Sequence, residues 1–165
     1  MNAKKTIQNL KENKLKLALA ESITGGLIAK TITDVPRASH VFEYGWITYS
    51  NKAKNKILGV PLNTLQKYGA VSKETVASMA MGAKTKSGAD IALAVSGFSG
   101  PDAPRKSDIG KVFIAIVAHK YLTIEEKKFK GNREEIRMQT CQAALSLVEK
   151  ALQKKGGIKN GRKSK

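Results

Sequence analysis

Two stretches of small polar residues, each following an apolar run, are the parts of this sequence best suited to chemistry. The stretch 21–26 (ESITGG) follows the apolar run 15–20, and the stretch 96–100 (SGFSG) follows the apolar run 91–95. Apolar runs of this kind are typical of strands buried on both faces of a sheet. If the two strands are parallel neighbours, both turns lie at the carboxyl edge of the sheet, where ligands of such sheets bind.

Ser22 stands between a predicted strand and the start of a predicted helix. Free backbone N–H groups at a helix start, together with Gly25 and Gly26, favour the binding of a phosphate or a developing oxyanion. Alternatively, Ser22 or Thr24 simply caps the helix, which is the commoner role of a serine in this place. Glu21 is either a catalytic acid or base, or a hydrogen-bond acceptor for the neighbouring backbone.

A serine nucleophile needs a base, and neither His40 nor His119 has a carboxylate set beside it in the sequence. A lysine with a lowered pKa can serve instead, as Ser–Lys enzymes show. Lys54 is a candidate because it lies one helical turn after the stretch Tyr49–Asn51, at the end of a predicted strand. The alternative is an ordinary solvated lysine, since lysines occur throughout the chain.

Arg133, at the start of the last predicted helix, has a side chain suited to bidentate phosphate binding. Its alternative role is an ion pair with Glu134, Glu135 or another surface acid. The sequence has no Cys and His cluster with the spacing of a metal site, and neither a Walker loop nor a dinucleotide fingerprint. We therefore expect no metal and no cofactor.

The elements that must position these residues alternate along the chain. Periodicity and N-caps at Ser72 and Asn132 predict helices over 3–14, 24–33, 51–58, 62–68, 72–87 and 132–153. Strands are predicted over 15–20, 45–50, 91–95, 112–118 and 122–129, the last two as an antiparallel hairpin. This order predicts an α/β fold, a three-layer α/β/α sandwich with a mixed, mostly parallel sheet, over residues 1–153.

The composition indicates the type of core and the cellular environment of this domain. Of the 165 residues 41% are hydrophobic but only 5% aromatic, which predicts an aliphatic core. No apolar run approaches the ~20 residues that a membrane helix needs, so no membrane partner is expected. The single cysteine, Cys141, is expected to be buried and fits a reducing, cytoplasmic environment. Trp46 is likewise expected in the core.

The formal net charge of +17 raises the question of a nucleic-acid partner. The lysines are spread along the whole chain, and the one dense basic patch, residues 154–165, has the composition of a disordered tail. Because no recognition motif accompanies the charge, nucleic acid is the less favoured partner. A small anionic substrate would also be attracted by this field.

Five different segments carry a resemblance to a known family: AESITGG (20–26), ITYSNKAKNKILGV (47–60), YGAVSKETVASMAMGA (68–83), SGFSGPD (96–102) and GNRE…R (131–137). Together they resemble the CinA C-terminal domain family, the nicotinamide mononucleotide amidases. The resemblance runs from residue 4 to about residue 150, in order and with family-like spacing. The short length implies a stand-alone domain, without the larger N-terminal domain that many relatives carry.

The resemblance implies an amidohydrolase of pyridine nucleotide salvage, which converts nicotinamide mononucleotide to nicotinic acid mononucleotide and ammonia without a cofactor. By position, Ser22 would be the nucleophile, Lys54 and Tyr49 would assist proton transfer, and Ser96 would contribute to the same site. Family precedent also suggests a homodimer. The residues expected to bind the nucleotide are Arg133, Thr24, Gly25, Gly26, Asn51 and Gly97.

Two parts of the sequence depart from the family's pattern. Ile23 stands where relatives usually have cysteine, and it is expected to point away from the turn as a packing residue. The segment 101–109 lacks the usual glycines, and its two prolines stiffen a loop expected to border the pocket. The alternative function is therefore a catalytically silent domain that binds a protein partner or nucleic acid. Retention of the five residues Ser22, Tyr49, Lys54, Ser96 and Arg133 favours the enzyme.

Overall fold

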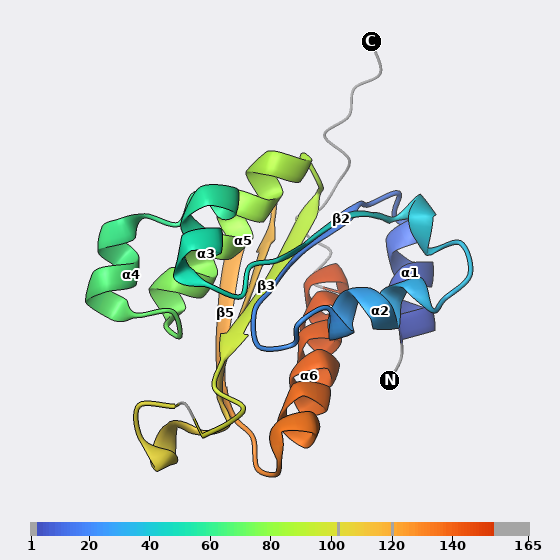
Figure 1. Cartoon of the computed structure of the whole chain (residues 1–165). Helices are drawn as coiled ribbons and strands as arrows, with labels where there is room; N and C mark the ends of the chain where they lie inside the picture. The colour runs from blue at the N-terminus through green and yellow to red at the C-terminus, as the bar shows by residue number, and fades with distance from the viewer. Residues whose placement is uncertain (1–2, 102, 120, 154–165) are drawn as a thin grey trace.

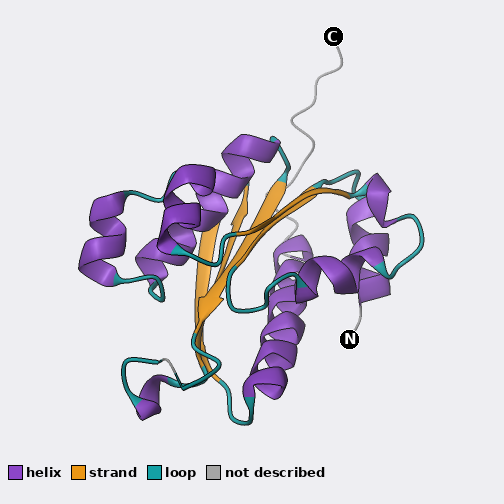
Figure 2. Cartoon of the chain, in the orientation of Figure 1, coloured by secondary structure: helices purple, strands orange, loops and turns teal. Residues whose placement is uncertain are grey.

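A five-stranded sheet with helices on both faces forms the centre of the molecule (Figures 1 and 2). The computed structural model describes residues 3–101, 103–119 and 121–153. The strands are β1 (Leu17–Glu21), β2 (Phe42–Ile47), β3 (Ile91–Gly97), β4 (Lys111–Ala118) and β5 (Tyr121–Lys128). The α-helices are α1 (Ala3–Glu12), α2 (Leu27–Thr33), α3 (Asn51–Leu58), α4 (Leu62–Tyr68), α5 (Lys73–Ser87) and α6 (Arg133–Gln153), and short 3₁₀ helices cover Ala38–His40 and Lys106–Asp108.

The sheet is mixed, with the strand order β2-β1-β3-β4-β5. Strand β1 pairs in parallel with both β2 and β3, whereas β4 pairs antiparallel with β3 and with β5. The predicted mixed sheet with a late hairpin is thus confirmed, and every antiparallel pairing involves β4. The parallel register places Glu21 opposite Val95, so the polar turns after β1 and β3 lie at the same edge of the sheet, as expected.

The two faces of the sheet carry side chains of different size, because successive residues of a strand point to opposite faces. On one face, large aliphatic residues such as Leu19 and Ile114 pack with α1, α2 and α6. On the other face, alanines such as Ala20 and Ala94 pack with α3, α4 and α5. Figure 2 shows the resulting three layers. The predicted sandwich and aliphatic core are confirmed, and Cys141 is buried in the first cluster.

Two predicted elements differ from the structure by three residues at a boundary, and the others by at most two. The strand predicted over 45–50 is Phe42–Ile47, because Ser50 is the N-cap of α3 and its Oγ accepts from the Ala53 amide. The helix predicted over 24–33 begins only at Leu27, since Gly25 and Gly26 have φ angles of 58° and 98°. The left-handed region is open to glycine but ends a right-handed helix. The N-caps predicted at Ser72 and Asn132 are confirmed by their hydrogen bonds to the amides of Thr75 and Glu135.

The described helices include none that is both long and apolar enough to span a membrane. The basic tail predicted over residues 154–165 lies outside the described residues.

Candidate active site

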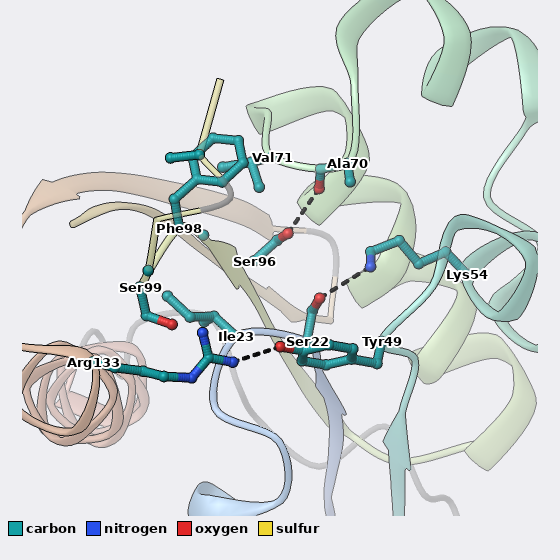
Figure 3. Close-up of a pocket in the computed structure, with 13 residues that line it drawn as sticks. Ser22, Ile23, Tyr49, Lys54, Ala70, Val71, Ser96, Phe98, Ser99 and Arg133 are labelled. Carbon is teal, nitrogen blue, oxygen red and sulfur yellow. Dashed lines mark hydrogen bonds between the residues drawn. The ribbon is translucent and has the colours of Figure 1, made fainter. Parts of the chain in front are cut away.

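Ser22 follows the last residue of β1 and lies beside the neighbouring strand β3. Its backbone amide donates a hydrogen bond of 3.1 Å to the carbonyl of Val95, which continues the β1–β3 pairing by one residue. Its side chain is 8% exposed and opens into a cavity of about 290 Å³ (Figure 3). The sheet therefore fixes the backbone of this serine while its hydroxyl stays accessible.

Lys54 lies on α3, where its ammonium group reaches Ser22 from the side of the sheet that α3 and α5 cover. The side chain is 1% exposed, and its Nζ donates to the Ser22 Oγ at 3.0 Å and to the Thr48 carbonyl at 2.8 Å. Among the ion pairs of the described residues, none involves Lys54. Burial lowers the pKa of Lys54 from 10.5 to about 8, because a cation without a carboxylate is costly to desolvate.

The cavity brings together six of the residues predicted from the sequence: Ser22, Tyr49, Lys54, Ser96, Gly97 and Arg133. Ser22 and Tyr49 follow β1 and β2, Ser96 and Gly97 end β3, Lys54 lies on α3 and Arg133 begins α6. Figure 3 shows the side chains from these elements around one cavity. The Ser96 hydroxyl donates to the Ala70 carbonyl at 2.7 Å, and the Arg133 Nη2 donates to the Tyr49 hydroxyl at 2.7 Å. The structure thus places Tyr49 and Arg133 in contact across the mouth of the cavity.

Arg133 does not form the ion pair that the sequence left open as its alternative role. Glu135 instead accepts a hydrogen bond from the Asn132 amide at 2.7 Å, and Asn132 in turn accepts from the Glu135 amide. This capping box occupies Glu135 at the start of α6. Within the described part of the chain, no carboxylate lies within ion-pair distance of the Arg133 guanidinium.

Thr24, Gly25, Gly26 and Asn51 are not among the residues that line this cavity. The expectation of free amides at the start of α2 is wrong, because Glu21 occupies them. Its carboxylate accepts from the amides of Gly26, Ile28 and Ala29 at 2.9, 3.2 and 2.7 Å. Of the two roles left open for Glu21, the structure therefore gives that of a backbone acceptor. The N-cap residue of α2 is Gly26, and the side chain that accepts from the first amides is that of Glu21, so Ser22 and Thr24 are not its caps.

Glu21→Ala is expected to lower the free energy of unfolding by about 2–4 kcal/mol, because three amides would lose a charged acceptor in a buried place. Glu21 is 1% exposed. Denaturant titration followed by circular dichroism measures the change. Glu43→Ala is the matched control, because Glu43 pairs with Lys16 at an exposed site, where such pairs contribute less than about 1 kcal/mol. Equal losses in the two variants would contradict the capping role of Glu21.

Ile23 and Ser99 are among the residues that line the cavity but were not assigned to the site from the sequence. Ile23 was expected to point away from the turn, but it is 4% exposed and packs against Gly97, where a Cβ would lie 2.9 Å from the Ile23 Cδ1. Ser99 is 7% exposed. The only signal for Ser99 was its place in a turn of small residues, which fits any loop equally well.

The segment 101–109 borders the cavity, as expected, through Ala103. It is attached to the end of β5 by Lys128, whose Nζ donates to the carbonyls of Ser107 and Ile109. The amide of Gly110 also donates to the Phe98 carbonyl at 2.7 Å. These bonds fix the base of the loop against the sheet.

Among the described residues, no three side chains of His, Cys, Asp or Glu come together in a way that would hold a metal ion. The chemistry that the cavity offers is that of a serine hydroxyl beside a buried amine, with a guanidinium at the opposite end (Figure 3).

The chain is similar to proteins of one family over most of its length. The model of the CinA C-terminal domain matches residues 1–152. A CinA-like protein of Akkermansia muciniphila is 55% identical over 114 residues, which are 68% of this chain and 27% of that protein. A putative competence-damage inducible protein of Caldicellulosiruptor bescii is 45% identical over 144 residues, 87% of this chain and 35% of the relative. The chain thus spans about a third of the length of these relatives or less.

Solved structures show the same fold. The competence/damage inducible protein CihA from Agrobacterium tumefaciens superposes with a TM-score of 0.87 at 37% identity, over 92% of this chain and 93% of that one. A CinA superfamily protein from Klebsiella pneumoniae superposes with a TM-score of 0.88 at 28% identity, over 93% and 99% of the two chains. The fold, the ordered motifs and the family match lead to one conclusion: this chain belongs to the CinA C-terminal domain family.

Proposed function

We propose that this domain is an amidohydrolase that converts nicotinamide mononucleotide to nicotinic acid mononucleotide and ammonia through an acyl-enzyme on Ser22. The observation that carries the proposal is the contact of 3.0 Å between the Ser22 Oγ and the Nζ of the buried Lys54. A lysine whose pKa is lowered to about 8 exists partly as the neutral amine near pH 8. Only that form can accept a proton from serine.

The reaction divides into two steps at one serine. As the Ser22 Oγ attacks the carboxamide carbon, its proton passes to the neutral Lys54 amine. The tetrahedral intermediate then expels ammonia, which takes that proton from Lys54. A water molecule attacks the resulting ester, gives its proton to Lys54, and the proton returns to the Ser22 oxygen as the acid is released. The overall balance is one amide and one water giving one acid and one ammonia.

The other polar groups of the cavity suit the two ends of this substrate. The Ser96 hydroxyl donates its proton to the Ala70 carbonyl, so its lone pairs face other partners and suit the NH₂ of a carboxamide. The Tyr49 hydroxyl accepts from Arg133, which leaves its own proton for donation. The guanidinium of Arg133 suits an anionic group, to which it can donate two parallel hydrogen bonds.

The test is incubation of the purified protein with nicotinamide mononucleotide, with ammonia and nicotinic acid mononucleotide measured separately. Equal amounts of the two products are expected, with faster release at pH 9 than at pH 7. Added hydroxylamine is expected to divert product to the hydroxamate, because an acyl-enzyme reacts with a stronger nucleophile than water. Absence of ammonia release between pH 6 and pH 9 would refute the proposed function.

A further inference from the structure

We propose that Arg137 is a positioning residue, which holds the turn of Ser22 in the geometry that the reaction needs. The inference rests on the proposed function only in taking Ser22 as the nucleophile. Arg137 lies on α6, and it is not among the residues that line the cavity. Its influence on the reaction must therefore pass through the backbone that carries the serine.

Arg137 reaches this turn because α6 lies beside α2 on the same face of the sheet (Figure 1). Its Nη2 donates a hydrogen bond of 2.5 Å to the Thr24 carbonyl. A Cβ at Gly25 would lie 3.2 Å from the same nitrogen, so the guanidinium packs directly against the main chain. Arg137 thus contacts the backbone two and three residues after Ser22.

The bond from Arg137 attaches the middle of the turn to the rest of the molecule. At the start of the turn the Ser22 amide is bonded to β3, and at its end the Gly26 amide is bonded to Glu21. The other main-chain hydrogen bonds of residues 23–25 run to Ser22 and to α2. Within the described part of the chain, the Arg137 bond is therefore the one hydrogen bond that joins the backbone of residues 23–25 to any other element.

The contact of Arg137 with the turn is poorly suited to stability alone. The Arg137 Nε and the Thr24 Oγ1 are both buried without a hydrogen-bond partner among the described residues, and each such atom costs free energy. The ion pairs of the described residues include none to Arg137, so its charged donor is directed to the Thr24 carbonyl. Local departures from the most stable choice of residue occur at the functional positions of natural proteins.

The place of this turn determines how Ser22 meets its base. The Lys54 Nζ is held separately by the Thr48 carbonyl at 2.8 Å, and α3 and α6 pack on opposite faces of the sheet. A displacement of the turn therefore changes the 3.0 Å distance between the Ser22 Oγ and the Lys54 Nζ without moving the lysine. A shift of about 1 Å in a reacting group can cost about 100-fold in rate.

The test compares Arg137→Met and Arg137→Lys with the wild type. Methionine keeps an unbranched side chain but has no donor, whereas lysine can still donate a hydrogen bond to the Thr24 carbonyl. Arg137→Met is expected to lower kcat for ammonia release about 10- to 100-fold and to change KM less than about twofold, because Arg137 does not line the cavity. Arg137→Lys is expected to restore kcat to within about fivefold of the wild type, since a single hydrogen bond does not need the guanidinium fork.

A second measurement follows Ser22 without the substrate. A fluorophosphonate forms an O–P bond with an activated serine and releases fluoride, and intact-mass spectrometry gives the rate of this modification. The rate is expected to fall about tenfold or more in Arg137→Met. Asn9→Ala is the control, because it removes another hydrogen bond to α6, the one of 2.7 Å from the Asn9 Nδ2 to Glu149, and it is expected to react like the wild type.

An unchanged kcat and modification rate in Arg137→Met would overturn the positioning role and leave the proposed function standing. Equal losses in Asn9→Ala and Arg137→Met would reduce the effect to general stability and would also overturn it. If the wild type releases no ammonia, but Ser22 is modified more slowly in Arg137→Met than in the wild type, the proposed function fails and the positioning role stands. If Ser22 of the wild type neither reacts with the reagent nor supports ammonia release, both fail.

Discussion

Ser22→Ala and Lys54→Met are each expected to lower kcat for amide hydrolysis by about 10³-fold or more, and the double variant by little more than the worse single variant. The physical reason is that the two residues form one unit. The Ser22 hydroxyl is a weak nucleophile without a base, and the described residues offer its Oγ no base other than the Lys54 amine at 3.0 Å. Once either side chain is removed, removal of the other lowers kcat little further. Steady-state rates of ammonia release by the wild type, the two single variants and the double variant give this double-mutant cycle.

The pH dependence tests the same pair in the wild-type protein. Burial lowers the pKa of Lys54 to about 8, and the base must be neutral to accept the proton of Ser22. The value of kcat/KM is therefore expected to rise as pH rises through about 8 and to level off above it, because protonation at lower pH removes the base. A lysine with an ordinary pKa would still be gaining activity above pH 10.

Lys56→Met is the matched control for the cycle, since Lys56 lies on the same helix but is exposed. It removes one positive charge from α3 and is expected to keep nearly full activity. Losses that multiply in the double variant would show that Ser22 and Lys54 act independently, and would contradict a shared proton transfer.

The main architecture was predictable because it depends on strong local patterns. The run 91–95 and the first hairpin strand were predicted correctly because their apolar residues are buried on both faces, as in Ile91 to Val95. Strand β2 was placed too late because it is an edge strand with mostly exposed or half-buried residues. Phe42, Tyr44 and Trp46 do alternate with Glu43 and Gly45, but the strand lacks the continuous apolar run that marked the buried strands.

The side-chain contacts of the site could not be predicted from the sequence. From residue chemistry alone, Lys54 is one lysine among many. Its contact with Ser22 depends on the parallel pairing of β1 with β2, which sets Glu21 opposite Ile47 and brings the start of α3 near Ser22. The role of Glu21 depends on the two left-handed glycines, which turn the chain so that α2 begins over the carboxylate. The same turn places Ile23 at the wall of the cavity. Such contacts follow from backbone geometry, which the identity of one residue does not fix.

Gly82→Ala is expected to lower the free energy of unfolding by about 2 kcal/mol or more, although alanine favours a helix by about 1 kcal/mol over glycine. Gly82 lies within α5, and a Cβ there would be 1.9 Å from the Leu58 carbonyl oxygen and 2.8 Å from the Leu58 carbonyl carbon. These are backbone atoms, so no rotation of a side chain relieves the overlap. Thermal or denaturant unfolding measures the loss, with Lys86→Ala at an exposed position of the same helix as a control near zero.

The same substitution connects packing to catalysis. Leu58 is the last residue of α3, and the Lys54 carbonyl one turn earlier accepts from the Val60 amide at 3.2 Å. A helix displaced by the new Cβ carries Lys54 with it, and a shift of about 1 Å in a reacting group can cost up to about 100-fold in rate. Gly82→Ala is therefore expected to lower kcat about 10- to 100-fold at a temperature where the protein remains folded. Full activity in a destabilised Gly82→Ala protein would mean that α3 keeps its place, and that α5 rather than α3 yields to the added methyl group.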